Sequence, residues 1–331
     1  MSAPIAWILR ARPQLIALVI ALGVNALLSP GFLTIHATDG RFYGSVIDIL
    51  DRGAPVALLA LGMSLVIATR GVDLSVGAVM AIAGACGAAI VNAGLPWPLA
   101  IAAGLGAGLL CGLWNGVLVA LLDIQPIVAT LILMVAGRGV AQLITDGRIL
   151  TFVEPHLAAI GGGAALGLPI PLLIAIAVGV LMLILVRVSA LGLFIEAIGI
   201  NSRASRLAGV NLKLVLISVY VASGLMAALA GLIVAADIKG ADSNNAGLWL
   251  ELDAILAAVV GGASLYGGRF ALSLAVIGAY ILQTVKTGIL RSGVPPEYNL
   301  IAMALVVAAL LVLQSPAMAS AFQRLIAKPA P

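Results

Sequence analysis

Residues 170–188 read IPLLIAIAVGVLMLILVRV, an apolar run whose one charged residue, Arg187, stands next to its end. A helix needs about 20 mostly apolar residues to cross the hydrocarbon core of a bilayer, and this run matches that length. A transmembrane β-strand would instead show a short segment of alternating hydrophobicity. The run therefore predicts a membrane-spanning α-helix, because a helix satisfies its backbone hydrogen bonds internally.

The composition of the whole chain also indicates that the protein lies in a lipid bilayer. Of the 331 residues, 63% are hydrophobic and 9% are charged, whereas a soluble domain carries about 25% charged residues. So few charges cannot cover a water-exposed surface of this size. We therefore expect an all-α integral membrane protein, with residues 1–331 forming a single transmembrane domain.

Similar apolar runs recur along the chain, and we expect about ten transmembrane helices. An even number of spans places both termini on one side of the membrane. The expected spans cover residues 13–30, 53–69, 74–93, 97–120, 126–145, 170–188, 213–236, 252–267, 271–290 and 298–315.

The charged residues support a cytoplasmic position for both termini. In that orientation most basic residues fall on the cytoplasmic side and most acidic residues fall outside, which agrees with the positive-inside pattern. The net charge of +4 then reflects membrane topology rather than nucleic-acid binding. The long connections are a cytoplasmic loop at about 189–212 and outer loops at about 31–52, 146–169 and 237–251.

Several motifs of energy conversion and catalysis are missing from the sequence. It contains no G-x-x-x-x-G-K-[ST], so the chain cannot hold ATP in a P-loop of its own. The only two histidines, His36 and His156, fall in predicted outer loops. We therefore expect no enzymatic activity, no metal site and no cofactor in this chain.

Residues 70–77 read RGVDLSVG and separate two apolar runs without a real loop. Asp73 is placed to cap the first turn of the span at 74–93, where a carboxylate also meets the positive end of the helix. The segment is either a plain cytoplasmic turn or a broken helix beside a translocation path. Broken helices are tolerated in membranes only beside protein or water. The spacing favours neither reading.

Small residues line one face of the fourth expected span, at Gly104, Gly108, Gly112 and Gly116. This spacing lets two helix backbones approach closely. The pair of helices either slides during a transport cycle or is statically packed, and we favour static packing.

Polar side chains inside the spans offer two further interpretations. Arg138 and Gln142 lie in the fifth span, and Asn115 and Gln125 lie in or beside the fourth and fifth spans. Intramembrane charges usually face a protein interior or a watery cavity. These residues either line a polar path or form an interhelical hydrogen-bond clamp.

The outer stretch 237–253 is densely polar, and it includes Asn244, Asn245 and Trp249. Amides suit sugar hydroxyls, and an indole ring suits the apolar face of a sugar. The same groups suit an external protein or simple solvation, and the pattern does not choose between these.

The cytoplasmic loop predicts a short amphipathic helix. Asn201 is a good N-cap and Gly209 a good C-terminal stop, with Arg203 and Arg206 between them. Such a helix rests on anionic lipid or docks a soluble partner. A capped insertion of this length in an otherwise tight membrane domain slightly favours docking.

Longer matching segments now identify a family. The chain resembles the permease subunits of ribose-type, simple-sugar ATP-binding cassette (ABC) importers through residues 71–77, Gly199 with Asn201, residues 251–255 (ELDAI) and residues 261–268 (GGASLYGG). Among these it is most similar to the galactofuranose importer permeases of Gram-negative bacteria. That branch is indicated by residues 40–50 (GRFYGSVIDIL), 124–139 (IQPIVATLILMVAGRG), 240–250 (GADSNNAGLWL) and 295–297 (PPE).

The resemblance implies an ABC importer permease fold in the bacterial inner membrane and a division of labour among subunits. A periplasmic binding protein would deliver the monosaccharide, and two permease subunits, this one with a paralogue or a second copy, would form the path. A cytoplasmic ATPase would bind ATP and Mg²⁺. Its docking loop here would contain Glu196, Gly199, Asn201, Arg203, Arg206 and Gly209.

The residues expected along the translocation path are Asp73, Ser75, Asn115, Gln125, Arg138, Gln142, Asn244, Asn245 and Trp249. Arg70 and Tyr266 depart from the family, in which smaller residues are common at these positions beside the motif glycines. These departures leave open whether this protein shares the substrate selectivity and the gating of the family.

The alternative function is an ion-coupled secondary sugar transporter. Such a protein needs a titratable or cation-binding site near the bilayer midplane. No carboxylate stands at the centre of any expected span, which counts against this alternative.

Overall fold

The structure, a computed structural model, describes residues 3–38 and 40–293, together with Tyr298, Ile301, Ala304, Leu305 and Ala308. In this part of the chain, seven helices are long and apolar enough to cross a membrane, and the apolar helix α3 is slightly shorter. The long helices are α1 (Ala3–Leu28), α2 (Ser45–Ala68), α4 (Trp97–Ala120), α5 (Pro126–Ile144), α7 (Ile170–Val188), α9 (Leu212–Asp237) and α11 (Leu272–Arg291), and α3 spans Val76–Asn92. The seven long helices confirm seven of the expected spans, and α3, although shorter, lies at the position of the expected span 74–93.

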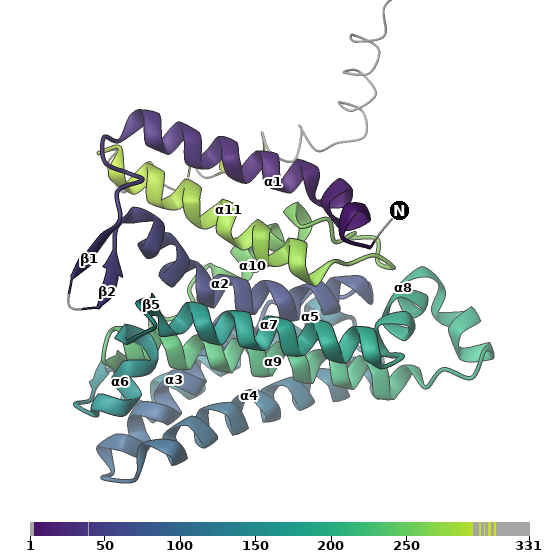
Figure 1. The fold of residues 1–331 in the computed structure, drawn as a ribbon. Helices are drawn as coiled ribbons and strands as arrows, with labels where there is room; N and C mark the ends of the chain where they lie inside the picture. The colour runs from purple at the N-terminus through teal and green to yellow at the C-terminus, as the bar shows by residue number, and fades with distance from the viewer. Residues whose placement is uncertain are drawn as a thin grey trace, which may run out of the picture.

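Three pairs of very short antiparallel strands lie in the expected outer loops. They are β1 (His36–Thr38) with β2 (Arg41–Tyr43), β3 (Leu150–Thr151) with β6 (Gly240–Ala241), and β4 (Ala164–Ala165) with β5 (Leu168–Pro169). The short helix α6 (Pro155–Gly162) belongs to the same region. Figure 1 shows β1, β2 and α6 at one end of the bundle, and helix α8 (Leu191–Leu207) at the other end with the N-terminus. The loop at 189–212 and the N-terminus therefore share a side, as expected.

The first outer loop is shorter than the sequence predicted. Helix α2 begins at Ser45, so residues 45–52 belong to the helix rather than to a loop ending at 52. Asp48 lies in the first turn of α2, where its negative charge faces the positive end of the helix. The charges in this turn suggested a loop, but they are compatible with a helix that begins at the membrane surface.

The expected span at 252–267 is wrong. Helix α10 covers only Leu250–Val260, 11 residues, or about 16 Å of helix, and residues 261–271 are not helical. Gly262, Gly267 and Gly268 have positive φ angles of 92°, 81° and 77°, a conformation that glycine adopts without steric cost and that ends the helix. The expected span at 298–315 lies outside the described residues, apart from the five isolated positions.

The helices form layers in which α2 and α9 are central. Figure 1 shows α1 beside α11 at one edge and α4 at the opposite edge, below α3 and α9. The glycine face of α4 packs directly on α9: a methyl group added at Gly108 would lie 2.5 Å from the Gly224 carbonyl oxygen, and one at Gly112 would lie 2.6 Å from the Tyr220 carbonyl oxygen. The predicted close approach of two backbones is confirmed.

Candidate functional site

The segment between α2 and α3 is a break inside the bundle. Residues 69–75 are not helical, yet Gly71, Asp73 and Ser75 are buried. Thr130 of α5 supports this non-helical backbone, because its hydroxyl accepts from the Leu74 amide at 3.2 Å and lies 3.2 Å from the Val72 carbonyl oxygen. This burial favours the broken-helix reading over a plain cytoplasmic turn.

Asp73 anchors a buried polar cluster on this break. Its Oδ1 accepts from the Ser75 amide at 3.0 Å and from the Ser75 hydroxyl at 2.6 Å. Its Oδ2 accepts from the hydroxyl of Ser223 in α9 at 2.7 Å. The Asn115 amide group of α4 donates to the Ser75 hydroxyl at 2.8 Å. Four side chains, two from the break and one each from α4 and α9, therefore form one hydrogen-bonded unit.

The capping role expected for Asp73 needs correction. The helix begins at Val76 after Ser75, and Asp73 binds Ser75 rather than an amide of the first turn. The second carboxylate oxygen is directed to α9 instead. Asp73 thus ties the break to a neighbouring helix, because the buried Ser223 hydroxyl provides a partner that local sequence does not reveal.

The position of this carboxylate also corrects an argument made from sequence. Ser223 is the twelfth residue of the 26-residue helix α9, so its partner Asp73 lies near the middle of a spanning helix. No expected span has a carboxylate at its centre, but Asp73, which lies between two spans, reaches this depth through the break. Asp73, Ser75 and Asn115 are at most 2% exposed in this chain, so they form an interior cluster rather than an open lining.

A second non-helical segment enters the bundle from the outer side, at residues 242–249. Its backbone meets the start of α3, since a methyl group on Gly77 would collide with the Gly247 carbonyl oxygen. The Arg138 side chain of α5 donates to the carbonyl oxygens of Ser243, at 3.0 Å, and Ala246, at 2.6 Å. Arg138 therefore acts as a hydrogen-bond clamp, although it joins α5 to a non-helical segment and not, as the sequence suggested, to another helix.

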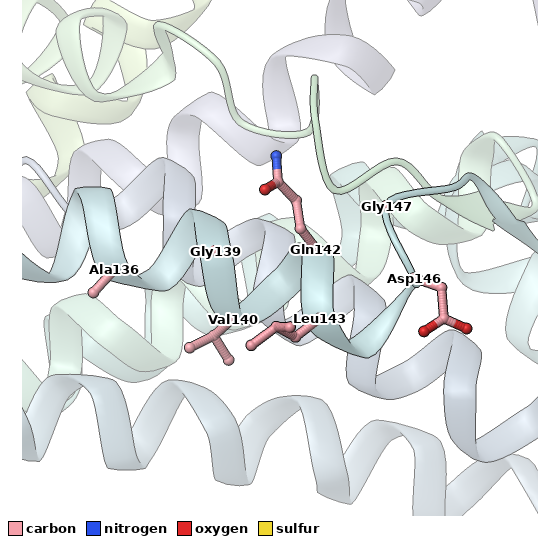
Figure 2. A pocket seen from close by; sticks show the side chains of 7 residues that line it. All are labelled: Ala136, Gly139, Val140, Gln142, Leu143, Asp146 and Gly147. Carbon is pink, nitrogen blue, oxygen red and sulfur yellow. The ribbon is translucent and has the colours of Figure 1, made fainter.

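One amide side chain of this segment binds α5, and the other binds a carboxylate of the segment itself. The Gln142 side chain donates to Asn244 at 2.8 Å, and Asn245 donates to Asp242 at 2.8 Å. Figure 2 shows Gln142 pointing to one side of α5, whereas Ala136, Val140 and Leu143 point to the other side; all four line an open hollow of about 520 Å³. Gln142 and Asn244 are thus placed together, as a shared polar surface requires.

The carboxylate of Asp242 organises the turn that holds these amides. Partial burial raises the pKa of this carboxyl, but hydrogen bonds from Asn245, from the Asn244 amide and the charge of Arg138 outweigh it. The pKa of Asp242 therefore lies below its usual range. Asp242 stays ionised at neutral pH and keeps the turn in place.

Trp249 ends the segment at the start of α10. Its backbone is left-handed, with φ of 66°, and 57% of the residue is exposed. Directly behind it, Asp253 of α10 accepts from the Lys286 side chain of α11. Trp249 thus lies at the surface, at the start of α10. The ion pair between Asp253 and Lys286 ties this part of α10 to α11.

Sequence reasoning did not select three residues that build these sites: Ser223, Thr130 and Asp253. Ser223 and Thr130 lie in apolar runs, 150 and 57 positions from Asp73 in sequence, and no local pattern marks them. The Asp253–Lys286 pair had a signal, since Lys286 is one of the few charges within a span.

Comparison with known proteins identifies the family of this chain. A family model described as "Branched-chain amino acid transport system / permease component" matches residues 45–312. The chain belongs to this permease family. No solved structure matches it.

Three curated relatives of the permease carry sugar names. The galactofuranose transporter permease protein of Escherichia coli (strain K12) is 60% identical over 92% of this chain and 89% of that protein. The fructose import permease protein of Bifidobacterium longum (strain NCC 2705) is 38% identical, over 92% and 87%. The ribose import permease protein of Escherichia coli (strain K12) is 36% identical, over 91% and 92%.

At the cytoplasmic end of the permease, α8 carries the expected capped helix as its second half. Asn201 interrupts α8 with φ of −156°, and its side chain accepts from the Ala204 amide at 3.0 Å. Gly209, with φ of 86°, donates to the Arg206 carbonyl oxygen at 3.0 Å. The expected cap and stop are confirmed, and Arg203 and Arg206 are exposed between them. The first half of α8 was not expected to be helical; Gly192, Ile195 and Ile198 bury its apolar side.

Gln125 lies apart from the other expected path residues. It is exposed in the turn between α4 and α5, where it lines a hollow of about 330 Å³ together with Arg206, Lys213 and Tyr220. The structure therefore divides the expected path residues into three groups: the buried cluster on the α2–α3 break, the outer segment with α5, and Gln125 at the cytoplasmic end.

Proposed function

We propose that this permease is the membrane-spanning subunit of an ABC sugar importer in a bacterial inner membrane, and that its substrate is a monosaccharide, with galactofuranose as the first candidate. The observation that carries the proposal is the 60% identity, over 92% of the chain, to a galactofuranose transporter permease. The fructose and ribose import permeases among the relatives support the broader substrate class.

The proposed path follows residues 242–249 and the adjoining face of α5. Gln142, Asn244 and Trp249 are exposed there, and an indole beside amides provides both contacts that a sugar offers. The short helix α10 begins at this point, and transport proteins commonly build their sites from such interrupted helices. A second permease subunit, a paralogue or another copy, would close the path on the opposite side, and a periplasmic binding protein would load it.

The proposed docking element for the ATPase is α8. Its second half presents Arg203 and Arg206 to solvent at the end of the bundle that holds the N-terminus. The sequence contains no P-loop of its own, so ATP and Mg²⁺ would be bound by the docked subunit. Glu196 and Gly199 lie in the first half of α8, which packs on the bundle.

The test is uptake of radiolabelled galactose into vesicles that contain the permease with its partner ATPase, second permease subunit and binding protein. Uptake should require ATP. Replacing Glu196, Arg203 and Arg206 together by alanine should abolish it while membrane insertion stays intact. The control is Arg148→Ala, which removes an exposed arginine from the outer loops. Full uptake by the triple variant would contradict the docking role of α8.

A second arm addresses the ion-coupled alternative. Vesicles without ATP are given a proton gradient, with the wild type compared with Asp73→Asn, since Asp73 is a buried carboxylate beside α9. We expect no uptake from either protein. Gradient-driven uptake that the substitution removes would establish secondary transport and overturn the proposal.

A further inference from the structure

Arg70 connects two segments that are far from it in sequence. Its Nε donates to the Tyr266 carbonyl oxygen at 3.0 Å, and its Nη2 donates to the Ile200 carbonyl oxygen at 2.8 Å. Tyr266 belongs to the non-helical break between α10 and α11, and Ile200 belongs to α8. One guanidinium therefore joins the end of α2 to the docking helix and to the second break, using a fork of donors that lysine lacks.

The backbones of the same three segments are in direct contact. The Gly268 amide donates at 2.8 Å to the carbonyl oxygen of Ala68, which is the last residue of α2. A methyl group on Gly199 of α8 would collide with both the Ala68 carbonyl oxygen and the Gly268 amide nitrogen. With no side chains between them, the three segments cannot shift past one another without breaking these hydrogen bonds.

The backbone conformation at position 70 disfavours arginine. Its φ is +67°, in the left-handed region that is strained for residues with a side chain and easy for glycine. Arginine therefore carries a conformational cost at this position. The feature that offsets this cost is the pair of hydrogen bonds to Ile200 and Tyr266, which are charge-assisted and stronger than neutral ones.

Arg70 and its two hydrogen-bond partners also lie next to the segments that hold the candidate functional residues. Arg70 lies within the break that Asp73 ties to α9. The break that contains Tyr266 follows α10, which begins just after Trp249. The Arg70 side chain is therefore hydrogen-bonded both to α8 and to the break that contains Tyr266.

We propose that Arg70 is a positioning residue that makes α8, the α2–α3 break and the α10–α11 break move as one body, so that movement of the docked ATPase reaches the transport surface. The inference rests on the proposed function, in which α8 docks the ATPase. It assigns Arg70 a role in energy coupling rather than in substrate contact.

The first test compares Arg70→Gly with the wild type in the importer vesicles. Glycine removes both hydrogen bonds and relieves the left-handed backbone, so the variant should fold and should co-purify with the ATPase. The number of ATP molecules hydrolysed per sugar imported should rise about tenfold, the factor that about 1.4 kcal/mol of lost coupling represents. Arg70→Lys, which can satisfy one acceptor, should give an intermediate ratio.

The matched control is Lys239→Gly. Lys239 is also a cation with positive φ, 52°, but it lies in the outer loop beside β6. Its substitution should leave the ratio of ATP to sugar unchanged. An unchanged ratio in Arg70→Gly would overturn the proposal. Loss of the ATPase from Arg70→Gly during purification would also overturn it, because Arg70 would then shape the docking surface instead of transmitting its movement.

The second test measures the rigid body directly. Spin labels are placed at the exposed residues Leu207 of α8 and Leu265 of the break, with Cys86 and Cys111 replaced by alanine. The wild type should give one narrow distance that is the same with and without nucleotide, whereas Arg70→Gly should give a broadened distribution. Equal distributions in the two proteins would overturn the inference even if the proposed function holds. Absence of ATP-driven uptake in the wild type would instead refute the proposed function, and the distances would still decide whether Arg70 holds the segments together.

Discussion

The Ser223 hydroxyl donates to the Asp73 carboxylate at 2.7 Å and joins the middle of α9 to the break between α2 and α3. Both side chains are at most 2% exposed. A buried carboxylate is costly unless hydrogen bonds compensate it. This one accepts from Ser223 and, twice, from Ser75.

Ser223→Ala should therefore destabilise the permease by about 1–3 kcal/mol, the usual cost of leaving a buried acceptor without its partner. Thermal unfolding in detergent measures the effect. The matched control is Ser64→Ala: Ser64 is equally buried, but its hydroxyl bonds only the Ala60 carbonyl oxygen within α2. Equal losses in the two variants would show that the Ser223–Asp73 bond has no special weight.

Gly108 on α4 supports a second prediction, about the packing of two helices. A methyl group at Gly108 would lie 2.5 Å from the Gly224 carbonyl oxygen of α9, so Gly108→Ala should force the helices apart and cost about 1–3 kcal/mol. Gly106, two residues away, has nothing within 4 Å of an added methyl group. Gly106→Ala should be neutral or slightly stabilising, and an equal loss at both positions in the unfolding assay would contradict the close-packed interface.

Apolar patterning predicted most of the fold, because lipid imposes one requirement on every spanning segment: an apolar helix of sufficient length. The same criterion explains the error at 252–267. The segment is apolar enough to span, but Gly261, Gly262, Gly267 and Gly268 end the helix after Val260. The Gly-rich segments at 70–77 and 261–269 resemble each other only faintly in sequence. The contact of the second segment with the end of α2, from the Gly268 amide to the Ala68 carbonyl oxygen, emerges from the tertiary packing alone.

The candidate site was predictable where the residues are neighbours in sequence. Asp73 with Ser75, and Asn244 with Asn245, were recognised because each pair stands in a polar segment between apolar runs. Ser223 was not recognised, since a single serine in a long apolar run is ordinary. The role of Arg138 could be recognised only in the structure, because its acceptors are backbone carbonyl groups. Every residue has such a group, so the sequence does not indicate which ones Arg138 binds.

Arg138 supports a third prediction, about the order of the outer segment. Arg138→Met keeps the length and loses both hydrogen bonds to Ser243 and Ala246, so the backbone amides of residues 242–247 should exchange with solvent at least about tenfold faster. Hydrogen exchange read by mass spectrometry measures this rate. Arg148→Met is the control, because Arg148 is exposed and pairs only with the exposed Asp146. Unchanged exchange in Arg138→Met would return Arg138 to the polar-path interpretation.

The last prediction concerns the ion pair between Lys286 and Asp253, which joins α11 to α10. Lys286→Met leaves the Asp253 carboxylate buried without its cation, and such a loss typically costs about 3–5 kcal/mol. Replacing both residues, with Lys286→Met and Asp253→Leu, removes the unpaired charge, so the double variant should be more stable than Lys286→Met alone. Unfolding of the wild type, both single variants and the double variant completes the cycle.

The same cycle separates stability from transport at the start of α10. Asp253 lies one helical turn beyond Trp249, so the ion pair fixes the direction in which the exposed indole emerges. If that orientation matters for the sugar, the double variant should recover stability without recovering galactose uptake in vesicles. Recovery of both would show that the pair only compensates two buried charges. Equal stability of the double variant and Lys286→Met would show that the two charges are not coupled, and the ion pair would then not be what holds α10 against α11.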